Sequence, residues 1–223
     1  MPWPSFFKPH DPSAPEWEIY IENFAFPFTN QLAIGEVSFV VLDLETTGLN
    51  SRKDSMLSLG AIRVDNLEMK VGERMEYFVH QEGYSPNKSI GIHGIMPGQT
   101  AEGIEETELL KKLLQFLGRS IIVGHHIGFD VAILNRAMKR VYGKPLQNKV
   151  IDTVQLVRKW DSLGFDRPHR NLGLDEVCRR WNIPLHERHT AAGDAFLTAI
   201  LFLKLCGKLQ SRGIRTLGAL LRT

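Results

Sequence analysis

The segment Phe39–Gly48, with the sequence FVVLDLETTG, decides the fold of this chain. It starts as an apolar, β-branched run that is typical of a buried strand, and it ends in a turn at Gly48. Asp43 and Glu45 are two residues apart, and side chains alternate across a strand, so both carboxylates must project from the same face. Adjacent carboxylates repel each other at neutral pH, which predicts a divalent cation bound between them. The alternative is a strand end with two solvated acids.

The segments that follow predict a mixed sheet. A strand over about 37–44 is followed across tight turns by strands over Met56–Val64 and Lys70–His80, which gives an antiparallel meander. From Thr100 onward, the apolar pattern predicts helices that alternate with short buried strands. We expect these strands at 121–123 and 150–152, and helices at about 101–118 (capped by Thr100), 130–142, 154–160, 171–181 (capped by Asn171), 191–205 and 214–222. This order predicts an α/β protein with a mixed five-stranded sheet and helices on both faces.

Composition indicates a globular protein of one main domain. The chain has 223 residues, of which 43% are hydrophobic and 23% charged. Cys178 and Cys206 have no partners at metal-site spacing and fit a reducing compartment. Residues 1–4 do not begin a signal peptide, and the apolar helix near 195–206 is too short to cross a bilayer. We therefore expect a cytoplasmic protein with no membrane contact.

Three regions follow from the pattern. Residues 1–35, rich in proline and aromatic side chains, predict an irregular N-terminal arm with a short helix around 16–24. Residues 36–208 contain the predicted sheet and form the main domain. Residues 209–223 predict a short C-terminal helix that packs on this domain or extends it.

Charge is distributed unevenly. Residues 1–130 carry 10 Lys and Arg against 18 Asp and Glu, whereas residues 131–223 carry 17 against 7. A basic half in a nearly neutral protein favours a polyanion as partner. Helix faces that simply differ in the sign of their solvated charges are the alternative.

Two further acids, Asp130 and Asp194, lie at positions where they could take part in catalysis. Asp130 opens a helix directly after a strand and a glycine-bounded loop, and its alternative role is a helix cap. His189 precedes Asp194 by five residues, which places the histidine in a loop and the acid on the following helix. A loop histidine and a solvated acid are the alternatives. His186 with His189, or His125 with His126, lack the further ligands that zinc requires.

Together these segments supply an oxygen-rich set of ligands and one histidine. Asp43, Glu45, Asp130 and Asp194, without a thiolate, suit Mg²⁺ or Mn²⁺. Two such ions about 3.5–4 Å apart clamp the attacking and leaving oxygens in phosphodiester cleavage. His189 has a side chain that titrates near neutrality and can take the proton of the attacking water, a contribution of roughly 10²–10⁴ in rate.

Three motifs in this order resemble those of the DEDDh exonucleases. They are DLETTG at 43–48, GHHIGFD at 124–130 and HTAAGD at 189–194. The chain resembles the proofreading epsilon subunit of bacterial DNA polymerase III and its stand-alone relatives over about 37–208. The resemblance implies the ribonuclease H-like fold and a 3′→5′ exonuclease that releases nucleoside monophosphates from single-stranded ends.

The resemblance also implies a role for each matched residue. Asp43, Glu45 and Asp194 hold the metal at the scissile phosphate, Asp130 serves a second metal, and His189 is the general base. Residues implied to lie against the substrate are Thr46, Thr47, Gly48, His93, His126 and Phe129. Two positions depart from the family pattern. His126 stands where asparagine is frequent, and it keeps a hydrogen-bonding side chain toward the substrate strand. Lys88 stands where the replicative subunit has an acid, so the implied recognition of the terminal nucleotide is open, whereas the metal site is unaffected.

The motifs do not determine whether the substrate is DNA or RNA, or in which cellular process the protein acts. We expect DNA 3′ ends of a proofreading or repair type, with trimming of RNA ends as the alternative. A polymerase-associated or nucleic-acid-binding subunit with an assembly role is the alternative of another class, and a DNA polymerase or another replication or repair protein is the expected protein partner. The end at Thr223 favours a stand-alone nuclease, or one bound through its N-terminal arm. Basic residues expected to follow the phosphates of a single strand, unless they are solvated, are Arg136, Lys139, Arg140, Lys204, Lys208, Arg212 and Arg215.

Overall fold

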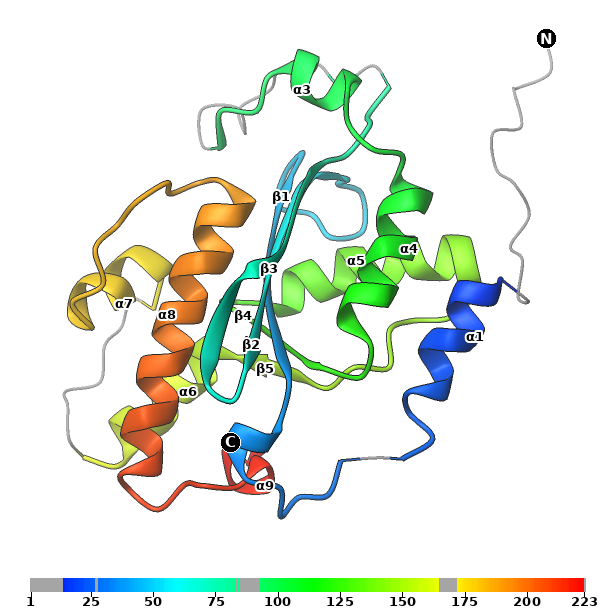
Figure 1. Cartoon of the computed structure of the whole chain (residues 1–223). Helices are drawn as coiled ribbons and strands as arrows, with labels where there is room; N and C mark the ends of the chain where they lie inside the picture. The colour runs from blue at the N-terminus through cyan, green and yellow to red at the C-terminus, as the bar shows by residue number, and fades with distance from the viewer. Residues whose placement is uncertain (1–13, 27, 83, 85–92, 165–171, 223) are drawn as a thin grey trace, which may run out of the picture.

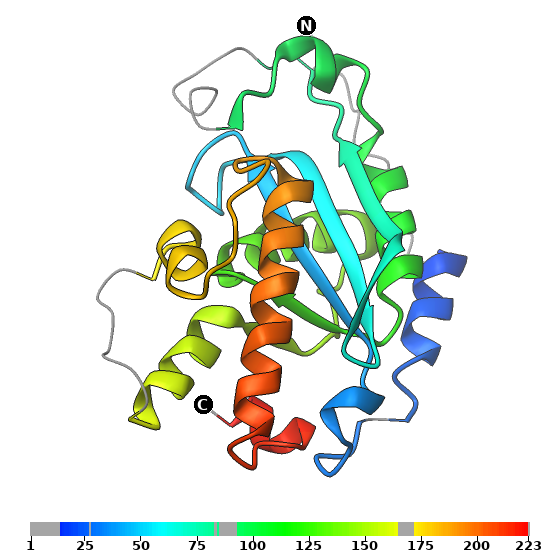
Figure 2. The same cartoon turned by 60° about the vertical axis from the view of Figure 1, so that its left-hand side comes forward.

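The computed structural model describes residues 14–26, 28–82, 84, 93–164 and 172–222 (Figure 1). Lys88 and Asn171 lie outside the described residues. Within them, five strands form one sheet in the order β3-β2-β1-β4-β5, and helices cover both of its faces, as the two views show (Figures 1 and 2). The strands are β1 (Phe39–Thr46), β2 (Met56–Asp65), β3 (Glu68–Phe78), β4 (Ile121–Gly124) and β5 (Val150–Asp152).

The topology confirms the mixed α/β fold. β1 pairs with β2 and β2 with β3 in antiparallel fashion, whereas β1 with β4 and β4 with β5 are parallel. In the register of β1 and β2, Asp43 lies opposite Gly60 and Glu45 opposite Ser58. The pairing of β1 with β4 ends at Val41 opposite Val123, so the carboxylates of β1 lie past the last pair.

Alternation along β1 sends its side chains into two separate cores. Phe39 and Val41 pack on one side, where the Phe39 ring meets Phe202 with ring centroids 4.9 Å apart. Val40 and Leu42 pack on the other side. Since side chains alternate, Asp43 and Glu45 continue the row that begins with Phe39.

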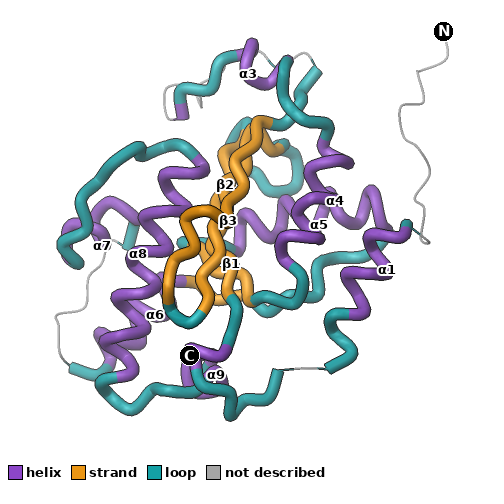
Figure 3. Tube along the Cα trace, viewed as in Figure 1, coloured by secondary structure: helices purple, strands orange, loops and turns teal. Residues whose placement is uncertain are grey.

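Figure 3 shows the strands between two sets of helices. The side of the sheet that Phe39 faces is covered by α6 (Thr153–Ser162), α7 (Leu174–Arg180), α8 (Ala191–Gln210) and α9 (Leu217–Leu221). The other side is covered by α1 (Pro15–Glu22), α4 (Glu106–Leu117) and α5 (Gly128–Tyr142). Short helical turns at η1 (Ile34–Glu36) and α3 (Pro97–Ala101) complete the described elements.

The prediction of a single helix over 101–118 is wrong. The chain forms α3 and α4 instead, with Gly103 between them. A Cβ on Gly103 would lie 2.6 Å from the backbone carbon of Val79, so this turn is pressed against the sheet and a continuous helix does not fit. Thr100 lies inside α3, where its Oγ1 donates to the Pro97 carbonyl at 3.0 Å, and it caps no helix.

Other boundaries shift by a few residues. The third strand begins earlier, at Glu68, and ends at Phe78 rather than His80. The helix predicted from 171 begins at Leu174, with Gly173 in the cap position. The long helix predicted to end near Leu205 continues through Gln210 as α8.

The described part of the N-terminal region packs on the domain through α1. Trp17 is buried, and its ring stacks on Tyr142 with centroids 5.4 Å apart. The Tyr20 hydroxyl donates to Asn148 Oδ1 at 2.6 Å. The two terminal regions also meet, because the Ile34 N–H donates to the Arg215 carbonyl at 3.0 Å. No helix in the described parts of the chain is both long and apolar enough to span a membrane.

Candidate active site

Three carboxylates converge where β1 meets the start of α8. One oxygen from each of Asp43, Glu45 and Asp194 lies within 4.8 Å of the others. Asp43 and Glu45 arrive from the α8-facing side of β1, and Asp194 comes from the first turn of α8. The pair expected from strand alternation therefore meets the acid expected from the third motif.

Two glycines let the helix come this close. A Cβ on Gly60 would lie 2.3 Å from the backbone carbon and oxygen of Ala191, so only a glycine in β2 admits the start of α8. A Cβ on Gly193 would lie 2.0 Å from the Glu187 carbonyl oxygen, so the loop before α8 folds back on its first turn. Thr190 caps α8, since its Oγ1 accepts from the Gly193 N–H at 3.1 Å.

Asp130 lies beside the three acids and supports the backbone of β1. It comes from the first turn of α5 and is buried, and its Oδ1 accepts a hydrogen bond from the Leu44 N–H at 3.0 Å. Leu44 lies past the last residue pair of β1 and β4, so the carboxylate takes the place that a strand partner would have. Among the described residues, Asp130 is not part of the three-acid group.

The site concentrates negative charge where water is scarce. Burial and the charges of Asp130, Asp194 and Glu45 raise the pKa of Asp43 well above its usual range. Burial, followed by the charge of Asp194, raises the pKa of Glu45 to about 7. Burial also raises the pKa of Asp130 to about 7. Such a cluster stays ionised at neutral pH only when a cation offsets its charge.

Arg188 is a site residue that the sequence reasoning missed. Its Nη1 forms an ion pair with Asp194 Oδ1, and its Nε donates to Asp175 Oδ1 on α7. The Arg188 charge lowers the pKa of both Asp43 and Glu45. Its position directly before His189 was the available signal, but a loop arginine has no periodicity that distinguishes it from a solvated one.

His189 lies outside the acid group. It is exposed, with a left-handed backbone φ of 63°. None of the hydrogen bonds recorded for the described residues involves its ring. The role of His189 as general base therefore stays a prediction.

The loop after β1 is closed by Asp54, a second residue that the sequence reasoning missed. The Thr47 hydroxyl donates to Asp54 Oδ1 at 2.9 Å, and the Thr46 hydroxyl donates to the Gly48 carbonyl at 2.7 Å. Arg136 donates to the Ser51 carbonyl at 2.6 Å and to that of Asp54. Arg136 thus ties this loop to α5, which leaves its guanidinium engaged within the fold rather than with a strand of nucleic acid.

The remaining predicted substrate residues differ in exposure and in their contacts. His93 is buried, and its Nδ1 accepts from the Ile95 N–H at 3.0 Å. His126 is exposed, with its N–H donating to Asp152 Oδ1 at 3.0 Å, and Phe129 is half-buried against the α4–α5 core.

The adjacent His125 is the buried member of the histidine pair. Its Nδ1 lies 2.7 Å from Thr153 Oγ1 and its Nε2 lies 2.7 Å from the Leu172 carbonyl oxygen. Burial lowers the pKa of His125 to about 4, so it stays neutral and joins β4 to α6 and to the start of the α7 segment.

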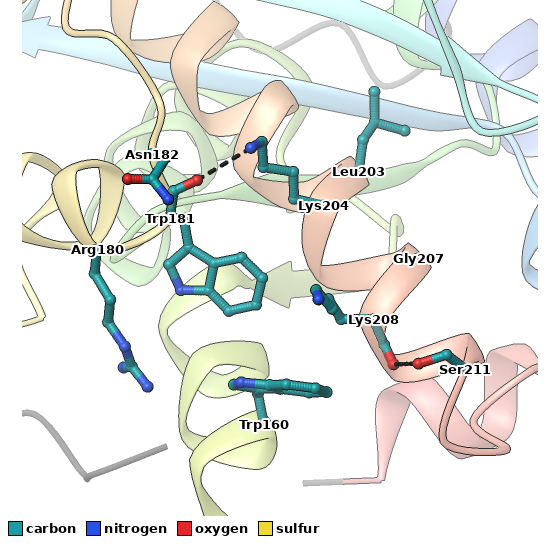
Figure 4. Close-up of a pocket in the computed structure, with 9 residues that line it drawn as sticks. All are labelled: Trp160, Arg180, Trp181, Asn182, Leu203, Lys204, Gly207, Lys208 and Ser211. Atoms are coloured by element: carbon teal, nitrogen blue, oxygen red, sulfur yellow. Dashed lines mark hydrogen bonds between the residues drawn. The ribbon is translucent and has the colours of Figure 1, made fainter. Parts of the chain in front are cut away.

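A hollow separate from the acid cluster lies farther along α8, between α6, α7 and α8 (Figure 4). Its volume is about 760 Å³, and Trp160, Trp181, Lys204 and Lys208 are among the residues that line it. The Trp160 and Trp181 rings meet edge to face with centroids 6.1 Å apart, and Lys204 Nζ donates to the Trp181 carbonyl at 3.1 Å. Two of the basic residues expected to follow a phosphate chain therefore line this hollow together with Trp160, which is buried, and Trp181, which is partly buried.

Comparison with known proteins places the chain among nucleases. The family model described as exonuclease (RNase_T) matches residues 40–202. The PolC-type DNA polymerase III of Oceanobacillus iheyensis is 31% identical over 180 residues, which are 80% of this chain and 12% of that protein. The DNA polymerase III subunit epsilon-like protein of Rhodobacter capsulatus is 32% identical over 191 residues, which are 84% of this chain and 26% of that protein. The chain thus spans a small part of these curated relatives.

Solved structures share the fold. Exonuclease I of E. coli, in complex with a dT13 oligonucleotide, has a TM-score of 0.69 at 20% identity and covers 79% of this chain and 42% of its own. Exonuclease I of Methylocaldum szegediense has a TM-score of 0.65 at 24% identity, with 79% and 41% covered. These neighbours confirm the ribonuclease H-like architecture.

Proposed function

The chain belongs to the exonuclease family whose model it matches over residues 40–202, and on this premise we propose that it is a metal-dependent 3′→5′ exonuclease. It hydrolyses phosphodiester bonds at single-stranded 3′ ends and releases nucleoside 5′-monophosphates. The observation that carries this proposal is the convergence of Asp43, Glu45 and Asp194, with their oxygens within 4.8 Å of one another.

The residues present fit divalent ions of the magnesium class. The converging ligand atoms are carboxylate oxygens, which Mg²⁺ and Mn²⁺ prefer, and no thiolate joins them in the described parts of the chain. The raised pKa values of Asp43 and Glu45 mark a surplus of negative charge that such an ion removes. When bound, such ions would stabilise the negative charge that develops on the phosphodiester during its hydrolysis.

The acidic side chains and His189 have different proposed roles. Asp43, Glu45 and Asp194 hold one ion, and Asp130, whose Oδ1 also holds the β1 backbone at Leu44, serves the second. His189 takes the proton of the attacking water on a ring nitrogen. In the structure its ring is exposed and lies outside the group of three acids.

The substrate end lies against the loop after β1. Thr46, Thr47 and Gly48 offer backbone groups to the terminal nucleotide, and the hydroxyls of the two threonines are already engaged within the loop. His93, His126 and Phe129 form the rest of this side. His126 donates its N–H inward to Asp152, which leaves its exposed ring available to the strand.

DNA is the proposed substrate, and replication or repair the proposed setting. Relatives of this chain are named as DNA polymerase III proteins, and a protein with the same fold was solved with a dT13 oligonucleotide. A DNA polymerase or another replication or repair protein is the proposed partner. RNA as the substrate is an outcome of the test below.

The test uses single-stranded DNA and RNA of equal sequence, each labelled at its 3′ end, with Mn²⁺. We expect mononucleotide release from DNA and its loss in Asp43→Ala, which removes one carboxylate of the cluster. Glu18→Gln on α1 is the matched control, because this exposed acid lies on the opposite side of the sheet. Release from neither nucleic acid would contradict the proposal, and release from RNA alone would move it to an exoribonuclease.

A further inference from the structure

Arg188 lies against the acid cluster and bridges two helices. It pairs with Asp194 in the first turn of α8 and with Asp175 on α7. The side chains of Arg188 and Asp194 are only 18% and 11% exposed. Surface ion pairs are screened by water, whereas a pair this buried is screened much less and is costly to break on one side.

We propose that Arg188 is the built-in counter-cation of the metal-free acid cluster, and that a divalent ion must displace it from Asp194 in order to bind. This inference rests on the proposed function, because it takes the acid cluster as the metal site. Arg188 is then a positioning residue that sets how readily the site takes up metal.

The competition follows from the chemistry of the two cations. A guanidinium keeps its proton at any physiological pH, so Arg188 cannot release Asp194 by losing its charge and must move instead. The Asp194 Oδ1 atom that Arg188 holds is buried. A divalent ion at that oxygen would be close to a fixed positive charge in a region of low dielectric, where like charges repel strongly.

The backbone around Arg188 is held in a conformation that few residues adopt. Glu187 has φ 51° and His189 has φ 63°, so left-handed non-glycine residues flank the arginine on both sides. Such conformations persist only where surrounding contacts impose them. The contacts here are the two Arg188 ion pairs and the hydrogen bond from Thr190 Oγ1 to the Glu187 carbonyl, at 2.8 Å.

Displacement of Arg188 therefore also affects the conformation of His189, the next residue in the chain. Loss of its pair with Asp194 removes one of the contacts that hold residues 187–189, and His189 belongs to this segment. His189 stands outside the acid group in the conformation that Arg188 stabilises. Metal entry and the approach of the proposed general base are thus linked through one arginine.

The test measures Mn²⁺ binding by calorimetry without nucleic acid, so that it does not depend on nuclease activity. Arg188→Gln should bind Mn²⁺ about tenfold more tightly than the unaltered protein, because the charge-assisted pair no longer competes. In EDTA it should melt at a lower temperature, because the acids lose their counter-cation, and Mn²⁺ should raise its melting temperature by more. Arg188→Lys, which keeps the charge but not the bridging geometry, should lie between the two.

Arg179→Gln is the matched control. Arg179 pairs with Glu176 at 3.4 Å and with Asp175 at 3.9 Å on the same helix, but its side chain is 60% exposed and contacts none of the converging acids. Its affinity for Mn²⁺ should equal that of the unaltered protein. An arginine that only ties α7 to α8 would lower the melting temperature equally in EDTA and in Mn²⁺.

The outcomes separate this inference from the proposed function. If Asp43→Ala loses Mn²⁺ binding but folded Arg188→Gln binds no more tightly than Arg179→Gln, the metal site stands and the role of Arg188 is refuted. If Arg188→Gln does not fold, equal affinities of Arg188→Lys and Arg179→Gln refute it in the same way. If the unaltered protein and Asp43→Ala bind Mn²⁺ alike, the metal site fails, and this inference fails with it.

Discussion

Gly60 in β2 and Ala191 at the start of α8 lie so close that a Cβ on the glycine would be 2.3 Å from the alanine carbonyl carbon. Gly60 is also the residue opposite Asp43 in the sheet. The contact therefore fixes the height of α8 above the strand that carries the first two acids. Asp194, three residues into α8, reaches those acids only because this position has no side chain.

Gly60→Ala should separate the acids. The added methyl group meets backbone on α8, which cannot rotate away, so the helix start must shift at a cost of roughly 1–3 kcal/mol. We expect a lower melting temperature and weaker Mn²⁺ binding. Gly72→Ala in β3 is the control, since a Cβ there meets nothing within 4 Å. Calorimetric titration with Mn²⁺ checks both variants, and an unchanged affinity in Gly60→Ala would contradict this account of the site.

Stability of the metal-free protein should fall as pH rises. Burial and neighbouring acids raise the pKa of Glu45 to about 7 from an ordinary value of 4.5. Between these values the folded state binds more protons than the unfolded state, so the stability from this group is present at low pH and lost as pH passes 7.

Glu45→Gln isolates this effect. In EDTA, the melting temperature of the unaltered protein should drop between pH 5 and pH 8 by on the order of 5 °C more than that of the variant. Saturating Mn²⁺ should remove most of the difference, because the ion offsets the charge that disfavours ionised Glu45. Parallel pH curves for the two proteins in EDTA would show that Glu45 is not destabilised by its surroundings.

The convergence of the acids could be predicted in part, because strand alternation is a local rule. Phe39 and Val41 contact α8-side residues, and the same alternation carries Asp43 and Glu45 to that side. The motif order then indicated that Asp194 would join them. The hydrogen bond from the Leu44 N–H to Asp130 could not be predicted, because it depends on where the pairing of β1 with β4 ends.

The features that the sequence did not reveal depend on contacts between distant segments. Arg188 became part of the site through Asp175 and Asp194, which α7 and α8 bring to it. The break between α3 and α4 follows from the approach of Gly103 to β3-side backbone. Which of two adjacent histidines is buried was decided by Thr153 and Leu172, neither of which is near them in sequence.

Lys204 and Lys208 should contribute to binding of long strands only. They line the hollow shown in Figure 4 and lie 10 and 14 residues after Asp194 on α8, which places them roughly 15–21 Å along the helix from the acids. A dinucleotide at the active site would be too short to reach them. The charge reversals Lys204→Glu and Lys208→Glu together should weaken binding of a dT16 strand at least fivefold and reduce its salt dependence.

The same double variant should bind a dT2 dinucleotide with unchanged affinity. Lys111→Glu together with Lys112→Glu on α4 is the control for the change in net charge, because α4 lies on the other side of the sheet. Fluorescence anisotropy in Ca²⁺ or EDTA measures binding without cleavage. Equal losses for both lengths would place the effect at the active site rather than along α8.

His189 should govern turnover without governing metal binding. It lies outside the group formed by Asp43, Glu45 and Asp194, so His189→Ala removes no ligand of that group, and the Mn²⁺ affinity should stay within about twofold. Loss of the proton acceptor should lower kcat by roughly 10²–10⁴. His186→Ala, an exposed histidine in the same loop, should change neither quantity. Single-turnover cleavage of 3′-labelled DNA, with calorimetry on the same samples, distinguishes these results, and a His189→Ala variant that no longer binds Mn²⁺ would make the histidine a ligand instead of a base.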